Sequence, residues 1–328
     1  MSNVETDPAE LTCEPTTNGP KWQVLPGRDV PLGGPRAMNV RRTLPHRDRS
    51  FVGAWCFVDH YGPDDVAATG GMDVPPHPHT GLQTVSWLFE GEIEHHDSGG
   101  NHGMVRPGEV NLMTGGSGIC HSEVSTARTT VLHGVQLWVV LPKQTVDAPR
   151  LFEHFAPQRL ALPAESGAAS ALVFLGNLGA ASAPIETHTP LLGAQLDLAP
   201  GTKLVLDVRA DFEHAVLLDT GSVQVDGTAL APAELACHDA GPQQISLEAG
   251  LDGARLMLLG GTPFDEEIVM WWNFVARTHD EIVAARDEWE AHSDRFGEVS
   301  GYVGPFERLP APTLPGGRLK TRGRLGRR

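Results

Sequence analysis

Two pairs of metal-ligand residues, each pair spaced two positions apart, constrain the fold of this chain more than any other feature. Residues 77–79 read His-Pro-His and residues 121–123 read His-Ser-Glu, with glycine turns nearby. Side chains two apart project from the same face of a β-strand, about 6.5–7 Å apart along it. Two such strands facing each other in a small barrel would bring His77, His79, His121 and Glu123 to one point. The pattern predicts one metal ion with open coordination positions.

Turn residues are frequent throughout the chain. It has 328 residues, with 37 glycines and 26 prolines against 6% aromatic residues. Dense turns favour many short strands over long helices, and the length alone predicts about two domains. We therefore expect an all-β architecture.

Changes in composition divide the chain. Five strands are expected before residue 142: Ser50–Val58, Thr84–Phe89, Glu92–His96, Glu109–Thr114 and Gly134–Leu141. A Pro- and Ala-rich stretch then precedes a second strand-rich block at about 191–261. We expect an N-terminal extension (1–40), a first barrel with the metal site (41–155), a linker (156–186), a second barrel without metal (187–300) and a basic tail (301–328).

The second block resembles a weak copy of the first at an offset of about 130 residues. Residues 88–93, Leu-Phe-Glu-Gly-Glu-Ile, correspond to 218–223, Leu-Asp-Thr-Gly-Ser-Val, and Pro107-Gly108 corresponds to Pro232-Ala233. The offset places Asp-Val-Arg, at 207–209, where the first copy has its His-Pro-His. The second copy has therefore lost its ligands. Three histidines remain there without a two-apart partner and are expected at the surface or in hydrogen-bonded core positions: His188, His214 and His238.

A helix is expected near the end of the second block. Thr278 and Glu281 have the spacing of a capping box, and Ile282, Ala285 and Trp289 follow at helical spacing. The pattern predicts a helix from about residue 279 to 292 that closes the second domain.

Charge and targeting signals narrow the class of protein. A formal net charge of −16 argues against general affinity for nucleic acid or for an anionic membrane. The basic stretch at 318–328 is interpreted as a disordered solubilising end, with contact to polyanions as the alternative. The four cysteines show no C-x-x-C spacing, and neither a signal peptide nor a membrane-spanning run is seen. These features predict a cytoplasmic protein.

Several motifs together resemble those of the pirin family, in the cupin superfamily. They lie in order between about residues 40 and 295, and include Pro-His-Pro-His at 76–79, Glu-Gly-Glu-Ile-Glu-His at 90–95, Arg-Pro-Gly at 106–108, Met-Thr-Gly-Gly-Ser-Gly-Ile at 113–119, His-Ser-Glu at 121–123 and Gly-Gly-Thr-Pro at 260–263. The resemblance implies a bicupin, two stacked antiparallel β-barrels with metal in the N-terminal one. It also implies that the ligands are His77, His79, His121 and Glu123, and that the metal is iron.

Two positions depart from the family pattern. Thr80 stands where the family has Arg, and Gln83 stands where it has Glu. Gln83 also falls near the glutamate of the general cupin motif, so one candidate carboxylate is neutral here. The departures affect the expected substrate more than the expected metal.

The ligand set suits several first-row divalent metals, because three nitrogens and one oxygen do not choose among them. One carboxylate leaves about one positive charge on the bound ion, which favours a bidentate anion such as a deprotonated hydroxy-ketone. The family resemblance implies an activity like that of quercetin 2,3-dioxygenase, with a flavonol-like or other enolisable small molecule and dioxygen as substrates. Glu123 is a candidate base for the hydroxyl proton, or a ligand only.

A non-catalytic function is the alternative. In this hypothesis the protein is regulatory, and its metal state changes a surface that meets a transcription factor or a metabolic enzyme. Fold alone does not choose between the two, since cupins host many functions.

Other polar and aromatic residues near the motifs receive structural interpretations. Cys120 is expected on the opposite strand face from its neighbour at 121, as a buried thiol. Of His95 and His96, one is expected to face solvent, with a role behind the ligands as the alternative. Residues 271 and 272, both Trp, are expected to pack between the barrels, and His60 is a candidate for the barrel mouth.

Overall fold

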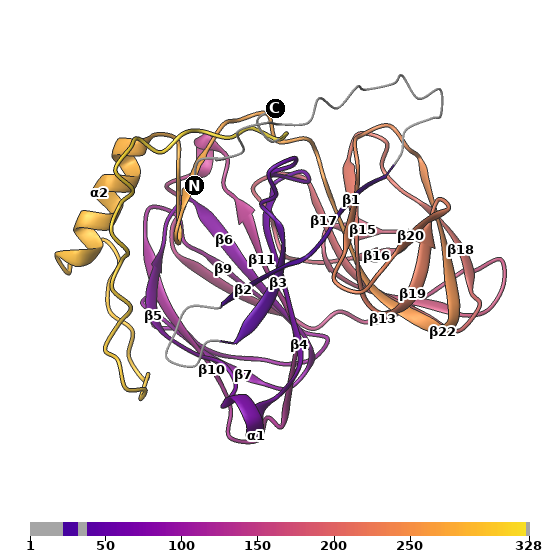
Figure 1. The fold of residues 1–328 in the computed structure, drawn as a ribbon, viewed down its shortest axis with the longest axis horizontal. Coiled ribbons are helices and arrows are strands. Elements are labelled where there is room, and N and C mark those ends of the chain that lie inside the picture. Colours follow the sequence, from indigo (N-terminus) through magenta and orange to yellow (C-terminus); the bar gives the residue numbers. More distant parts are fainter. Residues whose placement is uncertain (1–21, 32–37, 326–328) are drawn as a thin grey trace, which may run out of the picture.

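The computed structural model describes residues 22–31 and 38–325. Within them the chain forms mainly β-strands in two domains, which confirms the all-β bicupin prediction (Figure 1). Every strand ladder in this part of the chain is antiparallel, and no helix in it is long and apolar enough to cross a membrane. The three helical segments are short: α1 (Val66–Thr69), the 3-10 helix η1 (Lys143–Thr145) and α2 (His279–Glu290).

The first domain is built from two sheets. The larger has seven strands in the order β12 (Leu151–Phe155), β9 (Val110–Thr114), β6 (Leu82–Glu90), β11 (Val131–Val140), β4 (Trp55–Asp65), β3 (Asn39–Leu44) and β2 (Arg28–Pro31). The smaller has four, in the order β5 (Asp73–His79), β10 (Ile119–Ser125), β7 (Ile93–Asp97) and β8 (His102–Val105). Both strands that carry the predicted ligand pairs therefore belong to the smaller sheet.

The second domain is a nine-stranded sheet. Seven strands follow one another in the order β1 (Gln23–Leu25), β21 (Leu235–His238), β19 (Glu213–Val225), β22 (Gln244–Gly261), β17 (Leu191–Leu198), β14 (Ala169–Leu175) and β13 (Arg159–Leu162). Two more pair with its long strands, β18 (Lys203–Asp207) with β22 and β20 (Thr228–Leu230) with β19. Two small hairpins complete the fold: β15 (Asn177–Leu178) with β16 (Ala181–Ser182), and β23 (Val269–Trp271) with β24 (Phe274–Ala276).

Two segments expected outside the barrels contribute strands to them. Residues 23–25, expected in an N-terminal extension, form β1 and pair with β21 of the second domain. Residues 156–186, expected as a linker, carry β13 and β14 of the same sheet and the β15–β16 hairpin.

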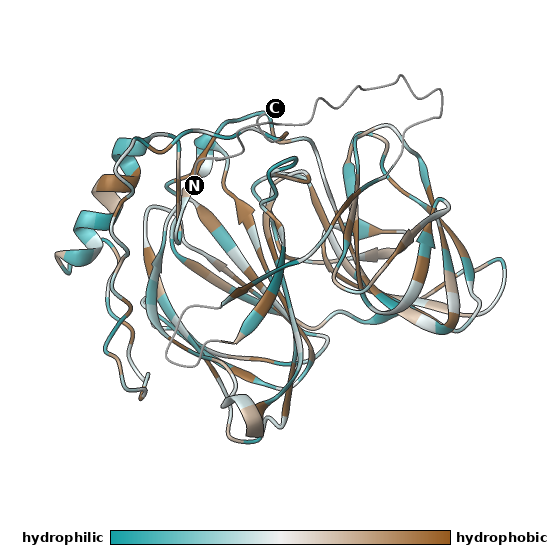
Figure 2. Cartoon of the chain, in the orientation of Figure 1, coloured by the Kyte–Doolittle hydropathy of each residue, from teal (hydrophilic) through white to brown (hydrophobic). Residues whose placement is uncertain are grey.

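Hydrophobic and hydrophilic residues interleave along the strands (Figure 2), as expected for sheets with one buried face. The largest buried apolar cluster draws on both domains, and Trp87 of β6 stacks on Phe174 of β14 with ring centroids 4.6 Å apart. The indole of Trp87 also donates to Gln195 Oε1 at 2.9 Å. The domains are thus joined by a continuous core.

The weak sequence repeat is visible in the backbone. Gly91 and Gly221, which correspond in the repeat, have φ of +90° and +81°. Gly108 and its counterpart Ala233 have φ of +74° and +65°, although alanine rarely adopts this conformation. Equivalent turns are therefore kept in both domains where the side chains have diverged.

Helix α2 begins where the capping box predicted it. Thr278 Oγ1 accepts from the backbone N–H of Glu281, and the Glu281 carboxylate accepts from the N–H of Thr278. The helix does not close the second domain, however. Its buried residues pack with Cys120 of β10 and with Phe274, so α2 covers the outer side of the first domain (Figure 1).

The basic tail is held against both domains up to residue 325. The guanidinium of Arg324 donates to the buried carboxylate of Glu213 at 2.6 Å, and its carbonyl accepts from Ser50 N at 2.8 Å. Arg322 pairs with Ile268 through two backbone hydrogen bonds. The interpretation of this stretch as disordered is therefore wrong for 318–325, because acidic groups on the folded domains fix its arginines.

Candidate metal centre

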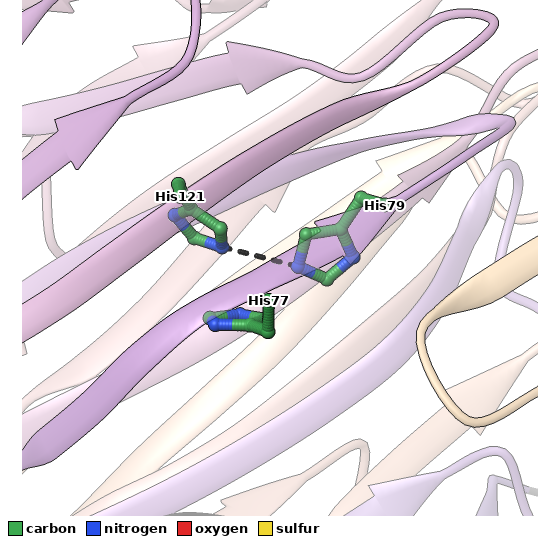
Figure 3. A group of neighbouring side chains, drawn as sticks. All are labelled: His77, His79 and His121. Carbon is green, nitrogen blue, oxygen red and sulfur yellow. Dashed lines mark hydrogen bonds between the residues drawn. The ribbon is translucent and has the colours of Figure 1, made fainter. Parts of the chain in front are cut away.

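The predicted histidines meet between strands β5 and β10. The register pairs His121 with His77 and Ile119 with His79, so three imidazoles project from one face of the smaller sheet (Figure 3). Ring centroids are 4.3 Å apart for His77 and His121, and 5.0 Å for His79 and His121. The two-residue spacing therefore places His77 and His79 on one face of β5, as predicted for that pair.

The three rings are almost inaccessible to solvent. Residue exposures are 6% for His77 and 1% each for His79 and His121. His77 Nδ1–H donates to the carbonyl of Pro75 at 2.8 Å, which leaves the Nε2 lone pair of neutral His77 available. The Nε2 atoms of His79 and His121 lie 3.1 Å apart. Three ring nitrogens therefore meet in one buried volume, all within 4.8 Å of one another.

Burial sets the charge of these histidines. It lowers the pKa of His77 to about 4, against a weaker opposing effect of the Pro75 carbonyl. Burial also lowers the pKa of His79 and of His121 well below the ordinary value, and neighbouring histidines lower both further. Neutral imidazole is the form that binds metal.

The donor set fits a divalent transition-metal ion. Two nitrogens bound at about 2.0–2.1 Å and separated by roughly 90–110° at the ion lie about 2.9–3.4 Å apart. The 3.1 Å between His79 Nε2 and His121 Nε2 falls in this range. Buried neutral imidazoles with a nearby carboxylate suit such ions by chemistry as well.

Glu123 lies beside the three-histidine group rather than within it. A register irregularity separates it from His121 on β10. Its side chain is buried, and its Oε1 accepts from Ser86 Oγ at 3.0 Å. It forms a second possible ligand group with His121 and His95. Burial raises the pKa of Glu123, and the nearby His95 and Ser86 counteract part of that rise.

His95 is the site residue that sequence reasoning underweighted. It lies on β7 opposite Glu123, and its Nδ1 is 3.3 Å from Nδ1 of His121. Asp97 lies 3.3 Å from its Nε2, and the ring stacks on Phe152 with centroids 4.8 Å apart. The sequence feature that could have identified His95 is the aspartate that follows it two residues later. Its neighbour His96 is the more exposed of the two, as expected for one member of the pair.

A cavity of about 410 Å³ opens at the histidines. On one wall, Arg42 lies over the ring of Phe57 at 4.1 Å, and Phe57 stacks on Trp138 with centroids 4.0 Å apart. Trp138 in turn meets His79 edge-on at 5.2 Å. The arginine is held by two 2.7 Å hydrogen bonds to buried Asp59. This wall of the cavity is therefore aromatic and contains a fixed ion pair.

The two departures from the family pattern lie outside this cavity lining. Gln83 is buried and donates to Thr114 Oγ1 at 2.9 Å. Thr80 accepts a backbone hydrogen bond at its carbonyl from Val275 N at 3.0 Å. Thr80 therefore attaches the β23–β24 hairpin to the end of the ligand strand.

Two further sequence expectations are resolved by the structure. Cys120 is buried on the opposite face, where its thiol lies 3.4 Å from the Gly297 carbonyl and burial raises its pKa to about 11. This confirms a structural thiol.

Trp271 and Trp272 do not pack between the barrels. They pack with the cluster under α2, and Trp272 also lines the cavity.

His60 lies at the domain interface, away from the cavity lining. Its Nε2 is 2.6 Å from Asp219 Oδ1 of the second domain, and His133 Nε2 is also 2.6 Å from that oxygen. Arg255 Nε donates to the other oxygen at 2.5 Å. A carboxylate from one domain is thus enclosed by two imidazoles from the other.

The histidines of the second domain do not form a metal site. His214 is buried with no hydrogen-bond partner for either ring nitrogen, contrary to the expected hydrogen-bonded position. Burial lowers its pKa to about 4. His238 donates to the Asp239 carbonyl at 2.6 Å, and His188 is partly exposed. In the described residues, no candidate metal group lies wholly within the second domain.

Comparison with known proteins finds the same two-part organisation. The model of the Pirin family matches residues 37–139, and that of the pirin C-terminal cupin domain matches residues 193–297. A Pseudomonas aeruginosa protein provisionally named as a quercetin 2,3-dioxygenase is 42% identical over 296 residues, covering 89% of this chain and 90% of that protein. A pirin-like protein of Caulobacter vibrioides is 36% identical, covering 83% of this chain and 94% of its own length.

A solved structure extends the similarity to three dimensions. The crystal structure of quercetin 2,3-dioxygenase from Acinetobacter baumannii superposes with a TM-score of 0.83 at 39% sequence identity. The match covers 92% of this chain and 97% of that one.

Proposed function

The chain belongs to the pirin family, and on that premise we propose that it is a metal-dependent dioxygenase. Its substrate is a flavonol-like or other enolisable small molecule. The names of the Pseudomonas and Acinetobacter relatives support an oxidoreductase of this kind. The observation that carries the proposal is the buried cluster of three neutral histidines that line a cavity of about 410 Å³.

His77, His79 and His121 hold the ion in this proposal, with Glu123 as the fourth ligand. Iron is the metal that the family resemblance implies. When bound, a divalent ion supplies Lewis-acid binding for an enolate and redox chemistry toward dioxygen. The charge of the site favours a substrate that binds as a bidentate anion.

The cavity suits a planar aromatic substrate. Stacked Phe57 and Trp138 both line the cavity next to His79 and give it an aromatic, apolar wall. Aromatic faces bind flat rings by offset or edge contacts. A 410 Å³ space is within the range of small-molecule sites in proteins.

In this proposal Glu123 accepts the proton of the substrate hydroxyl, and Ser86 accepts a hydrogen bond from the protonated carboxyl group. Ser86 Oγ lies 3.0 Å from Glu123 Oε1 and 3.0 Å from Gln136 Oε1. A hydroxyl has one proton and cannot donate to both acceptors at once. When Glu123 takes a proton at Oε1, it can donate to Ser86 Oγ, which then donates to Gln136. Burial, which raises the pKa of Glu123, favours its action as the acceptor.

Dioxygen uptake tests the proposal. Iron-loaded protein is mixed with quercetin, and with an enolisable diketone, in an oxygen-electrode cell. We expect uptake by the wild type and its loss in His121→Ala. The matched control is His188→Ala, a partly exposed histidine outside the site, which should retain uptake.

If the metal-loaded wild type consumes no oxygen with either substrate class, the proposed dioxygenase activity is contradicted. Recovery of a specific protein partner whose binding depends on the metal would then favour the regulatory alternative.

A further inference from the structure

Part of the cavity wall comes from the second half of the chain. Met270, Trp272 and Asn273 line it from the β23–β24 hairpin, and Leu309 and Arg322 line it from the C-terminal segment. The first domain alone therefore supplies the histidines but not the whole substrate space.

The hairpin is fixed to the strand that carries His77 and His79. Thr80 directly follows β5 and forms a parallel bridge with Phe274, and its carbonyl accepts from Val275 N at 3.0 Å. A Cβ on Gly81 would lie 2.2 Å from the Val275 carbonyl oxygen. This close approach requires glycine, whose φ is +70° here. The wall therefore cannot move freely relative to the histidines.

Trp272 occupies an unfavourable position in that wall. Trp271 pairs with Phe274, so residues 272 and 273 form a two-residue turn. Trp272 has φ of +52°, a strained conformation for a bulky L-residue that glycine or asparagine adopts more readily. The hairpin itself does not need an indole at this position. What the strained residue adds is an aromatic ring on the wall of the cavity.

We propose that Trp272 is a specificity-determining residue that binds a ring of a planar aromatic substrate in this cavity. This rests on the proposed function, since it assigns a role within the same substrate site. The half-buried indole meets Phe274 edge-on, with centroids 5.4 Å apart, which supports the ring from behind. A small diketone such as acetylacetone has no aromatic ring and therefore cannot make this ring contact.

Two variants and two substrates test this assignment. Trp272→Gly removes the indole at a φ that glycine tolerates, so the turn is retained, and Trp272→Phe keeps an aromatic ring. KM and kcat are measured with a flavonol and with acetylacetone, and flavonol affinity of the metal-loaded protein is measured by equilibrium titration. We expect Trp272→Gly to raise the flavonol KM and Kd about tenfold, with acetylacetone kinetics unchanged and with affinity largely restored in Trp272→Phe.

The possible failures can be told apart. If the Gly variant binds and turns over the flavonol like the wild type, or loses both substrates equally, the assignment of Trp272 is overturned. If the wild type binds the flavonol without oxygen uptake, the proposed dioxygenase fails, and the tenfold difference in Kd still decides the role of Trp272. A wild type that binds no flavonol overturns the assignment of Trp272, and oxygen uptake with acetylacetone then decides the proposed dioxygenase.

Discussion

The Nε2 atoms of His79 and His121 lie 3.1 Å apart, although 42 positions separate the two residues in the chain. The contact arises because β5 and β10 are adjacent antiparallel strands whose register places residue 119 opposite residue 79. Two short motifs thus become one site only through strand pairing. The chemistry of the protein depends on that register.

Replacing one histidine of this cluster should abolish metal binding. In His77→Ala, we expect affinity for a divalent metal to fall at least about 100-fold, because one of three converging nitrogens is lost. Elemental analysis of protein purified without added ions checks this. About one equivalent of metal is expected in the wild type and in the His188→Ala control. Wild-type protein that takes up no metal even after reconstitution would refute the site.

The stability of metal-free protein should fall as the pH falls. His77 has a folded-state pKa of about 4 against 6.5 for an ordinary histidine. Between these values the unfolded chain takes up a proton at residue 77 and the folded chain does not, so the free energy of unfolding decreases as the pH decreases through this window. The contribution is up to about 1.4 kcal/mol per pH unit.

Urea unfolding of chelator-treated protein at pH 7, 6 and 5 measures this dependence. Other buried groups also titrate, and the raised pKa of Glu123 acts in the opposite direction. The comparison is therefore with His77→Gln, which should show a smaller decrease. Equal pH dependence in both proteins would contradict the assignment.

The carboxylate at the domain interface should be important for stability. Asp219→Asn removes the charge that Arg255, His60 and His133 surround, and leaves a partly buried guanidinium without its partner. We expect the free energy of unfolding to fall by about 3 kcal/mol. Thermal or urea unfolding gives the value. Asp211→Asn, which removes an exposed carboxylate paired with Arg209, is the control and should leave the midpoint nearly unchanged.

Truncating an arginine in the tail should loosen the C-terminal segment. Glu213 is fully buried and accepts from both Arg49 and Arg324. Arg324→Ala removes one of these charged donors, and we expect a loss of about 1–2 kcal/mol. Limited proteolysis followed by mass spectrometry should show faster cleavage near residue 325. Arg318→Ala, in an exposed pair with Asp280, should behave like the wild type, and equal cleavage of all three proteins would mean that the tail is not held there.

The local patterns that proved predictive were those with a short-range physical cause. The capping box at Thr278 and Glu281 fixed the start of α2, because its hydrogen bonds link residues within one turn. The expected strand at 50–58 was less accurate, since β4 runs from Trp55 to Asp65 and residues 50–54 form a turn and isolated bridges. Apolar residues there pack between the domains, so their run of hydrophobicity did not mark a strand.

The sequence by itself determined the strand periodicity, the all-β class and the histidines that meet at the site, because side-chain alternation is a property of each strand alone. Only the tertiary structure decided that Glu123 lies next to His95, that Trp272 lines the cavity and that α2 covers the first domain. These contacts join segments tens to hundreds of residues apart. They follow from which apolar faces are buried together, and no local pattern encodes that choice.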